Sequence, residues 1–297
     1  MHVLAAMLVA AVPLAASAQQ QSLTHGGMER TYVVRAPRNI TRASTPLPVV
    51  VVLHGGGGNA ANAEQMTGFT RLVERERIFV VYPNGTGRLK NRLLTWNAVH
   101  CCGSAMESRV DDVGFIGAML DALIAQYPVD QRRIYVTGMS NGAMMSHRAG
   151  RELPHRIAAI APVVGAVFGD ETPAASPVSA IIFNGLKDTS VPPQGGLSDG
   201  AGRRAWDGTP ARPNLDQGGY WARVNSCGSA PTLAERGLVL HWTYQCPAGR
   251  AVELYQLKDN GHAWPGGRPG SRRGDRPSTA LDATEVMWNF FKAHPRN

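Results

Sequence analysis

Short apolar runs alternate with amphipathic stretches along most of the chain. Continuous β-branched and aromatic runs of this kind are typical of strands covered on both faces of a sheet. They lie at 49–53, 78–82, 133–137, 157–164 and 179–184, with two more strands expected at 238–245 and 252–257 and an edge strand at 28–35. Apolar spacing of three and four predicts helices at 60–77, 111–127, 143–149, 215–224 and 280–291. This alternation predicts an α/β fold with a mostly parallel central sheet and helices on both faces.

The first eighteen residues differ from the rest. Residues 3–12 form an apolar run too short to span a bilayer, and Ala16-Ser17-Ala18 offers a small-x-small cleavage site. We therefore expect a signal peptide at 1–18, although its amino-terminal part has no Lys or Arg, and one catalytic domain at 19–297. The expected location is extracellular or periplasmic. No later segment reaches eighteen apolar residues, so no membrane span is expected.

The four cysteines suggest disulfides in an exported chain, and four cysteines allow three connectivities. Cys227 and Cys246 bracket a predicted hairpin and are the expected pair. The adjacent Cys101 and Cys102 could form a vicinal disulfide or remain free. A zinc site is disfavoured, because no second C-x-x-C is present and only His100 lies beside these cysteines. No metal and no cofactor are expected.

The formal charge is +8, and arginines cluster in the predicted loops. Nucleic-acid binding is disfavoured, because the sequence has neither a basic recognition helix nor a basic strand interleaved with aromatic residues. A solvated basic surface accounts for most of this charge. A sharper alternative is attraction of an anionic substrate or polymer to the rim of a site.

The segment Gly138-Met139-Ser140-Asn141-Gly142 lies between a predicted strand and a predicted helix. A strand, G-x-S-x-G and a helix form the nucleophile elbow of α/β-hydrolases. So sharp a turn strains the serine backbone and requires neighbours without bulk, which the two glycines provide. The competing interpretation is an ordinary turn with a capping serine. The flanking elements favour Ser140 as a nucleophile.

A second glycine-rich segment, His54 followed by residues 55–58, comes directly after the most apolar strand. Bare backbone amides at such a place can bind a developing oxyanion, as in the HGGG loop of esterases. A flexible turn is the plainer alternative, and a phosphate loop is disfavoured because no G-K-[ST] follows. We expect Gly56 or Gly57 to supply one donor and the Asn141 amide the other.

An acid and a base follow later strands, in the order expected for this fold. Asp188 lies just past the strand at 179–184, and His262 follows the strand at 252–257. His262 would take the serine proton and Asp188 would orient the imidazole. Rivals for these roles fit other tasks better: the acids are Asp111, Asp112 and Asp170, and the bases are His54, His100, His147, His155 and His241. A metal-dependent hydrolase is a weak alternative, because no H-E-x-x-H is present.

These motifs together resemble a known family. The runs HGGGGNA, CCG followed by DDVGFI, GMSNGAMM, NGLKDTSVP and GHAWPGG are similar to those of polyhydroxybutyrate depolymerase-like esterases, which overlap with feruloyl and acetylxylan esterases of carbohydrate esterase family 1. The resemblance extends from about Thr31 to about Phe291. It implies a single α/β-hydrolase domain, secretion, no cofactor, and a triad of Ser140, Asp188 and His262. Asn141 departs from the pattern, because the family often has Ala there.

The expected activity is hydrolysis of carboxylic esters of polyhydroxyalkanoate-oligomer, feruloyl or acetyl type through an acyl-enzyme. Trp96 and Trp264 are candidate pocket walls, and their alternative is a place in the core. Arg268 opens a basic loop that could favour an anionic polymer, such as a polyaspartate-like amide or a uronate ester. A non-catalytic binding protein is a further alternative, against which the intact triad argues. The sequence leaves the oligomeric state open.

Overall fold

The computed structural model describes residues 19–89, 92–199 and 205–296, and the expected signal peptide lies outside them. The strands within the described residues are β1 (Gln19–His25), β2 (Met28–Arg35), β3 (Leu47–Leu53), β4 (Phe79–Pro83), β5 (Val129–Met139), β6 (Ala159–Val163), β7 (Ser179–Gly185), β8 (Thr232–Arg236), β9 (Val239–Tyr244) and β10 (Val252–Leu257). The helices there are α1 (Ala60–Thr67), η1 (Phe69–Arg71), α2 (Leu72–Glu76), α3 (Gly103–Glu107), α4 (Asp112–Gln126), α5 (Asn141–Glu152), α6 (Asn214–Val224) and α7 (Ala283–Ala293).

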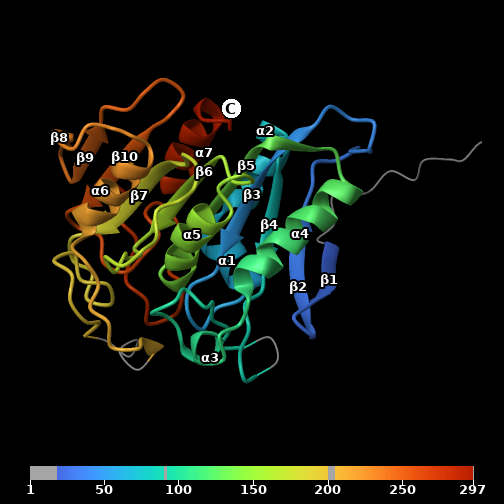
Figure 1. Ribbon diagram of the computed structural model, residues 1–297, viewed down its shortest axis with the longest axis horizontal. Helices are drawn as coiled ribbons and strands as arrows, with labels where there is room; N and C mark the ends of the chain where they lie inside the picture. The colour runs from blue at the N-terminus through green and yellow to red at the C-terminus, as the bar shows by residue number, and fades with distance from the viewer. Residues whose placement is uncertain (1–18, 90–91, 200–204, 297) are drawn as a thin grey trace, which may run out of the picture.

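All of these strands join in one sheet of order β1-β2-β4-β3-β5-β6-β7-β10-β9-β8, which crosses Figure 1 from right to left. The six central strands, from β4 to β10, are parallel, and the outer hairpins β1–β2 and β9–β8 are antiparallel to their neighbours. The predicted α/β-hydrolase fold with a mostly parallel sheet is therefore confirmed.

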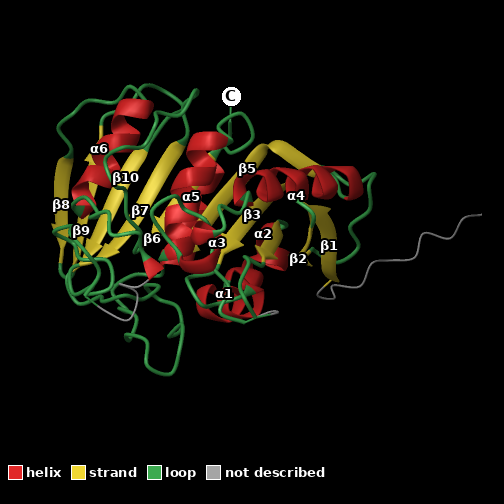
Figure 2. Ribbon diagram, turned by 60° about the horizontal axis from the view of Figure 1, so that its bottom comes forward, coloured by secondary structure: helices red, strands yellow, loops and turns green. Residues whose placement is uncertain are grey.

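The alternation of side chains along β3 divides the core into two layers. Val49, Val51 and Leu53 pack with α4, α5 and α6, whereas Val50 and Val52 pack with α1, α2 and α7. Figure 1 shows α4 and α5 in front of the sheet, and the turned view of Figure 2 shows helices along both of its faces. Every residue of β3 is buried, which explains its continuous apolar run.

Several elements differ from the sequence prediction. The polar run that begins at Gln19 is strand β1, because its backbone pairs with β2 along its whole length. Strand β8 was not expected either, since all of its residues are exposed and carry no apolar pattern. The helix predicted at 60–77 is broken by Gly68, whose φ of 66° ends α1 in a left-handed cap.

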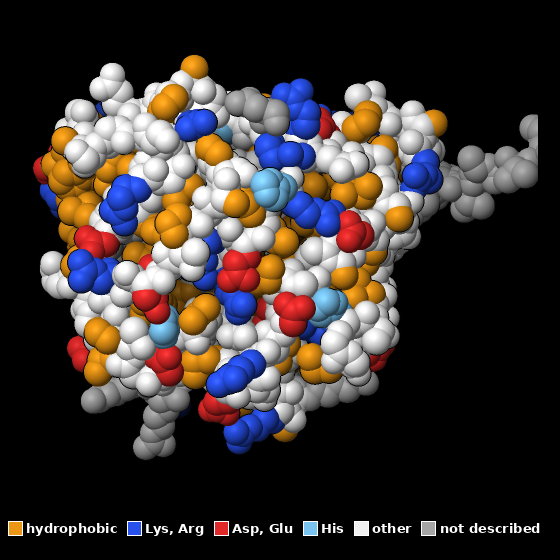
Figure 3. Space-filling view, in the orientation of Figure 1, with side chains coloured by type: hydrophobic (Ala, Val, Ile, Leu, Met, Phe, Trp, Pro, Cys, Tyr) orange, Lys and Arg blue, Asp and Glu red, His pale blue; other side chains and the backbone are white. Residues whose placement is uncertain are grey.

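Charged side chains of both signs are interspersed over the face shown in Figure 3. Within the described part of the chain, no helix combines the length and apolar character needed to cross a bilayer.

Candidate active site

Four loops meet at one edge of the sheet, where the parallel strands end. The glycine loop follows β3, Ser140 follows β5, Asp188 follows β7 and His262 follows β10. Ser140 and His262 line the same pocket of about 340 Å³. The described residues that line it also include Gly55, Gly56, Gly57, Gly58, Asn59, Asn62, Met66, Met139, Gly270, Ser271 and Gly274.

The turn at Ser140 has the strained geometry of a nucleophile elbow. Ser140 has φ 58° and ψ −122°, a conformation that residues with a side chain rarely adopt. A Cβ on Gly138 would lie 2.6 Å from the backbone of Gly142, and a Cβ on Gly142 would lie 2.5 Å from the carbonyl oxygen of Leu53. Both glycines are therefore required by close packing of the turn against β3. The Asn141 amide opens helix α5, so the positive end of the helix dipole faces the pocket.

Asp188 and His262 form a hydrogen-bonded pair. His262 Nδ1 lies 2.8 Å from Asp188 Oδ2, and the Asp188 side chain is 1% exposed. The other carboxylate oxygen accepts the backbone N–H groups of Ser190 and Val191, each at 2.8 Å. These contacts fix the carboxylate, which in turn directs the imidazole, 19% exposed, into the pocket.

Of the two glycines considered as oxyanion donors, only Gly56 remains available. The Gly57 N–H donates to the carbonyl oxygen of Leu94 at 2.8 Å, so the prediction that admits Gly57 as a donor is wrong. Gly56 packs beside Asn141, since a Cβ on Gly56 would lie 3.7 Å from the Asn141 Cβ. Gly56, in the pocket wall, and Asn141, directly after Ser140, therefore lie side by side.

His54 holds the glycine loop in place. Its Nδ1 lies 2.8 Å from the Gly55 carbonyl oxygen, and its Nε2 accepts the Gly85 N–H at 3.0 Å. Burial lowers the pKa of His54 to about 4, so the imidazole is neutral and can serve as this acceptor. His54 thus orders the glycine loop.

Comparison with known proteins identifies the family. Residues 31–212, more than half of the chain, match the esterase PHB depolymerase family model. The chain belongs to this esterase family. The expected resemblance to this family is confirmed.

The chain is also similar to individual esterases and depolymerases, and it shares its fold with a solved structure. The chain is 27% identical over 246 residues to feruloyl esterase B of Piromyces equi, covering 81% of this chain and 44% of that protein. It is 31% identical over 126 residues to poly(3-hydroxyalkanoate) depolymerase C of Paucimonas lemoignei, covering 41% of this chain and 28% of that protein. The chain thus matches less than half the length of these relatives. The acetyl xylan esterase from Aspergillus awamori shares the fold, with a TM-score of 0.63 at 16% identity over 93% of this chain and 99% of that one.

The side chain of Asn141, where the family often has Ala, fastens a loop to the elbow. Its Oδ1 accepts the Trp96 N–H at 2.7 Å, and its Nδ2 donates to the Trp96 carbonyl oxygen at 2.9 Å. Asn141 is 1% exposed, so this pair of bonds is shielded from water. Sequence reasoning missed the contact, because Asn141 and Trp96 are separated by 45 residues.

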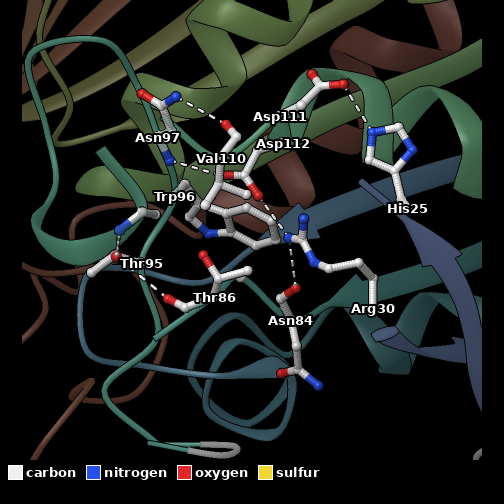
Figure 4. Close-up of polar contacts among 12 residues, drawn as sticks. His25, Arg30, Asn84, Thr86, Thr95, Trp96, Asn97, Val110, Asp111 and Asp112 are labelled. Carbon is white, nitrogen blue, oxygen red and sulfur yellow. Dashed lines mark hydrogen bonds and ion pairs between the residues drawn. The ribbon is translucent and has the colours of Figure 1, made fainter. Parts of the chain in front are cut away.

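Trp96 does not wall the pocket, and that prediction is wrong. The side chain is fully buried and donates from Nε1 to the His54 carbonyl oxygen at 3.0 Å. It also packs against the His54 ring, with 4.9 Å between the ring centroids. Figure 4 shows the Trp96 ring beside a network of polar contacts that includes Arg30 and Asp112. In that network Asp112 accepts both Arg30 Nη2, at 2.6 Å, and the Asn97 N–H, at 2.7 Å.

Trp264 does not wall the pocket and Arg268 is not part of its described lining, so the prediction of these two side chains as substrate-binding residues is wrong. Trp264 is fully buried, and its Nε1 donates to Thr284 Oγ1 of α7 at 3.0 Å. Arg268 is exposed and lines a separate hollow beside Met66, whose carbonyl oxygen accepts the Arg268 N–H at 2.9 Å. The basic loop nevertheless reaches the pocket, through Gly270, Ser271 and Gly274.

Disulfides are present, as expected. Cys227 is bonded to Cys246 with an S–S distance of 2.03 Å, which links the end of α6 to the end of β9. Cys101 is bonded to Cys102 across a cis peptide bond. Among the described residues, no group of three His, Cys, Asp or Glu side chains is placed to hold a metal ion.

Proposed function

We propose that the chain hydrolyses carboxylic esters with Ser140 as nucleophile, His262 as base and Asp188 as the residue that orients His262. The observation that carries the proposal is the bond between Asp188 and His262 beside a pocket that also contains the strained Ser140. A serine at an elbow, a base and a fixed carboxylate are the three groups that acyl transfer requires.

In the first half-reaction, Ser140 Oγ attacks the ester carbonyl carbon while His262 Nε2 takes the hydroxyl proton. The tetrahedral intermediate then breaks its bond to the alcohol oxygen, which leaves with the proton from His262. Water, deprotonated by the same nitrogen, attacks the acyl-enzyme and releases the acid and free Ser140. The Gly56 and Asn141 amides would donate to the oxyanion of both intermediates, and one such donor typically contributes about 3 kcal/mol.

The test is Ser140→Ala, with Ser229→Ala as a matched control on an exposed loop. We expect Ser140→Ala to lower kcat on p-nitrophenyl acetate by at least about a thousandfold. Ser229→Ala should match the parent protein. Equal activity of the Ser140→Ala and parent proteins, both shown to be folded by circular dichroism, would refute the proposed nucleophile.

For the acyl group, we propose a short aliphatic acid, as in an acetyl ester or a hydroxyalkanoate oligomer, ahead of a feruloyl group. Named relatives include a feruloyl esterase and a poly(3-hydroxyalkanoate) depolymerase. The described lining of the pocket contains Met66 and Met139 but no Phe, Tyr or Trp that could stack on a feruloyl ring. We expect kcat/KM to be higher on hydroxybutyrate oligomers than on ethyl ferulate.

An anionic polymer is a second candidate, because the loop that lines the pocket carries several cationic side chains. They are exposed and have no ion-pair partner among the described residues: Arg268, Arg272, Arg273 and Arg276. Such charges would raise the rate of encounter with an anionic ester. Added salt should then slow hydrolysis of an anionic ester but not of a neutral ester of similar size, because salt screens the attraction between the arginines and the anion. Equal salt dependence would exclude this candidate.

We further propose that the chain is exported after cleavage behind Ala18, to which disulfides are suited. Amino-terminal sequencing of the exported protein should begin at Gln19.

A further inference from the structure

A second hollow, of about 310 Å³, lies at the opposite edge of the sheet from the pocket. Ala158, just before β6, and Ser179, the first residue of β7, contribute to its wall, as does Arg250, just before β10. Because these strands are parallel, their beginnings face away from the loops that carry Ser140, Asp188 and His262. The hollow therefore cannot be an extension of the candidate active site.

The described lining of this hollow is basic. It contains the side chains of His155, Arg250 and Arg296 but no Asp or Glu. Neither arginine forms an ion pair with a described carboxylate. Arg250 Nη1 donates only to the Asn225 carbonyl oxygen, at 3.1 Å, and the Nε of Arg296 is buried without an acceptor. Cationic groups that are partly withdrawn from water without a counter-ion favour an anion.

A buried side-chain amide in the lining favours a ligand that also carries a hydrogen-bond donor. Asn225 is fully buried and lines the hollow. Its Nδ2 donates to the carbonyl oxygens of Val178, at 2.7 Å, and Trp221, at 2.9 Å, so its orientation is fixed. Its Oδ1 accepts no hydrogen bond from any described residue. Leaving such an acceptor unpaired typically costs about 1–3 kcal/mol, so a ligand with a hydrogen-bond donor would be favoured.

We propose that this hollow binds a phosphate group, as the free ion or as a monoester. A phosphate supplies negative oxygens for Arg250 and Arg296 and, near pH 6, a P–OH group that can donate to Asn225 Oδ1. Ser176 and His155, whose Oγ and Nδ1 lie 3.2 Å apart at the same wall, offer further polar groups. The proposal does not depend on the reaction proposed for Ser140.

The decisive comparison is between inorganic phosphate and sulfate, measured by isothermal titration calorimetry at pH 6. The two ions are close in shape, but sulfate carries no proton at this pH. We expect phosphate to bind about tenfold more tightly, as one satisfied buried acceptor implies. Equal affinity would overturn the role of Asn225, and no binding of phosphate would overturn the site.

Substitutions of single residues show whether phosphate binds in this hollow. Arg250→Gln should weaken phosphate binding about tenfold or more, because a charge-assisted bond is lost. Arg236→Gln, an equal change of charge on exposed strand β8, should leave it unchanged, as should Ser140→Ala in the other pocket. Equal effects of Arg250→Gln and Arg236→Gln would overturn the proposal.

Glycerol 3-phosphate distinguishes the source of the phosphate. Tighter binding than inorganic phosphate would support a monoester as the ligand, and weaker binding would support the free ion. Failure of both to bind would overturn the site, whatever the outcome for ester hydrolysis.

Discussion

At the scale of single residues, the candidate site depends on polar side chains that fix backbone groups. Asp188 is fixed by two backbone N–H groups, His54 by the glycine loop, and Asn141 by both polar backbone groups of Trp96. The groups proposed to react are therefore positioned before a substrate arrives, which is the condition for electrostatic stabilisation of a transition state.

Asn141→Ala tests one of these contacts. The backbone amide at position 141 would remain, so we expect hydrolysis to fall less than about tenfold, whereas Trp96 would lose two buried partners. The Trp96 carbonyl oxygen would keep the Ala98 and Cys102 N–H groups, so the single unsatisfied Trp96 N–H should lower the free energy of unfolding by roughly 1–3 kcal/mol. Urea denaturation measures the change. Asn289→Ala, at an exposed position of α7, is the control, and similar stability of the two variants would contradict the expectation.

Sequence reasoning predicted the position of residues that directly follow a strand, whereas their catalytic roles stay a prediction. Ser140, Asp188 and His262 each follow a parallel strand, and such strands end at one edge. It was wrong for Trp96, Trp264 and Arg268, because the direction of a loop side chain depends on contacts distant in sequence. Trp264, for example, is turned inward by its bond to Thr284 of α7.

At the scale of elements, the segment 268–276 forms one wall of the pocket and is fastened at several points. Asn62 Nδ2 donates to the Gly270 carbonyl oxygen at 2.7 Å, and Asp275 Oδ2 accepts the His262 N–H at 2.6 Å. The second bond joins this wall directly to the proposed base. A change in the wall should therefore alter the position of the imidazole.

Asp275→Ala should lower kcat/KM on a neutral ester by roughly tenfold, the effect of one lost hydrogen bond to a positioned group. Asp275→Asn keeps an oxygen acceptor and should retain most of the activity. Steady-state kinetics on p-nitrophenyl acetate measures both. If the two variants were equally impaired, the carboxylate charge rather than the hydrogen bond would be the cause.

The central elements were predictable because buried strands and amphipathic helices have strong periodic patterns. Strand β8 and the helix break at Gly68 were not, since an exposed edge strand needs no apolar residue and a glycine is tolerated within a helical pattern. Pairing between chain segments, and not local preference, determines β1 and β8.

At the scale of the whole molecule, two buried histidines make stability depend on pH. Burial lowers the pKa of His54 and of His147 to about 4, from an ordinary value of 6.5. His147 is held neutral between the Trp221 Nε1–H and Gln217 Oε1, at 2.8 and 2.9 Å. Between these pKa values the unfolded chain binds protons that the folded chain does not.

The stability contributed by these histidines should be complete above pH 6.5 and be lost progressively as the pH falls toward 4. The expected loss is roughly 3 kcal/mol for each histidine. Urea midpoints measured between pH 7.5 and 4.5 would show it, and His147→Gln should reduce the dependence on pH. A midpoint that stayed constant from pH 6.5 to 5 would contradict the expectation.

The two antiparallel margins of the sheet carry none of the loops around the pocket. Their hairpin tips, Gly26-Gly27 and Gly237, have positive φ angles and open space around them. Both tips lie outside the described lining of the pocket, so an affinity tag or a surface-immobilising peptide can be inserted at either one without replacing a lining residue. The architecture thus supplies two natural attachment points for fusing or anchoring the protein.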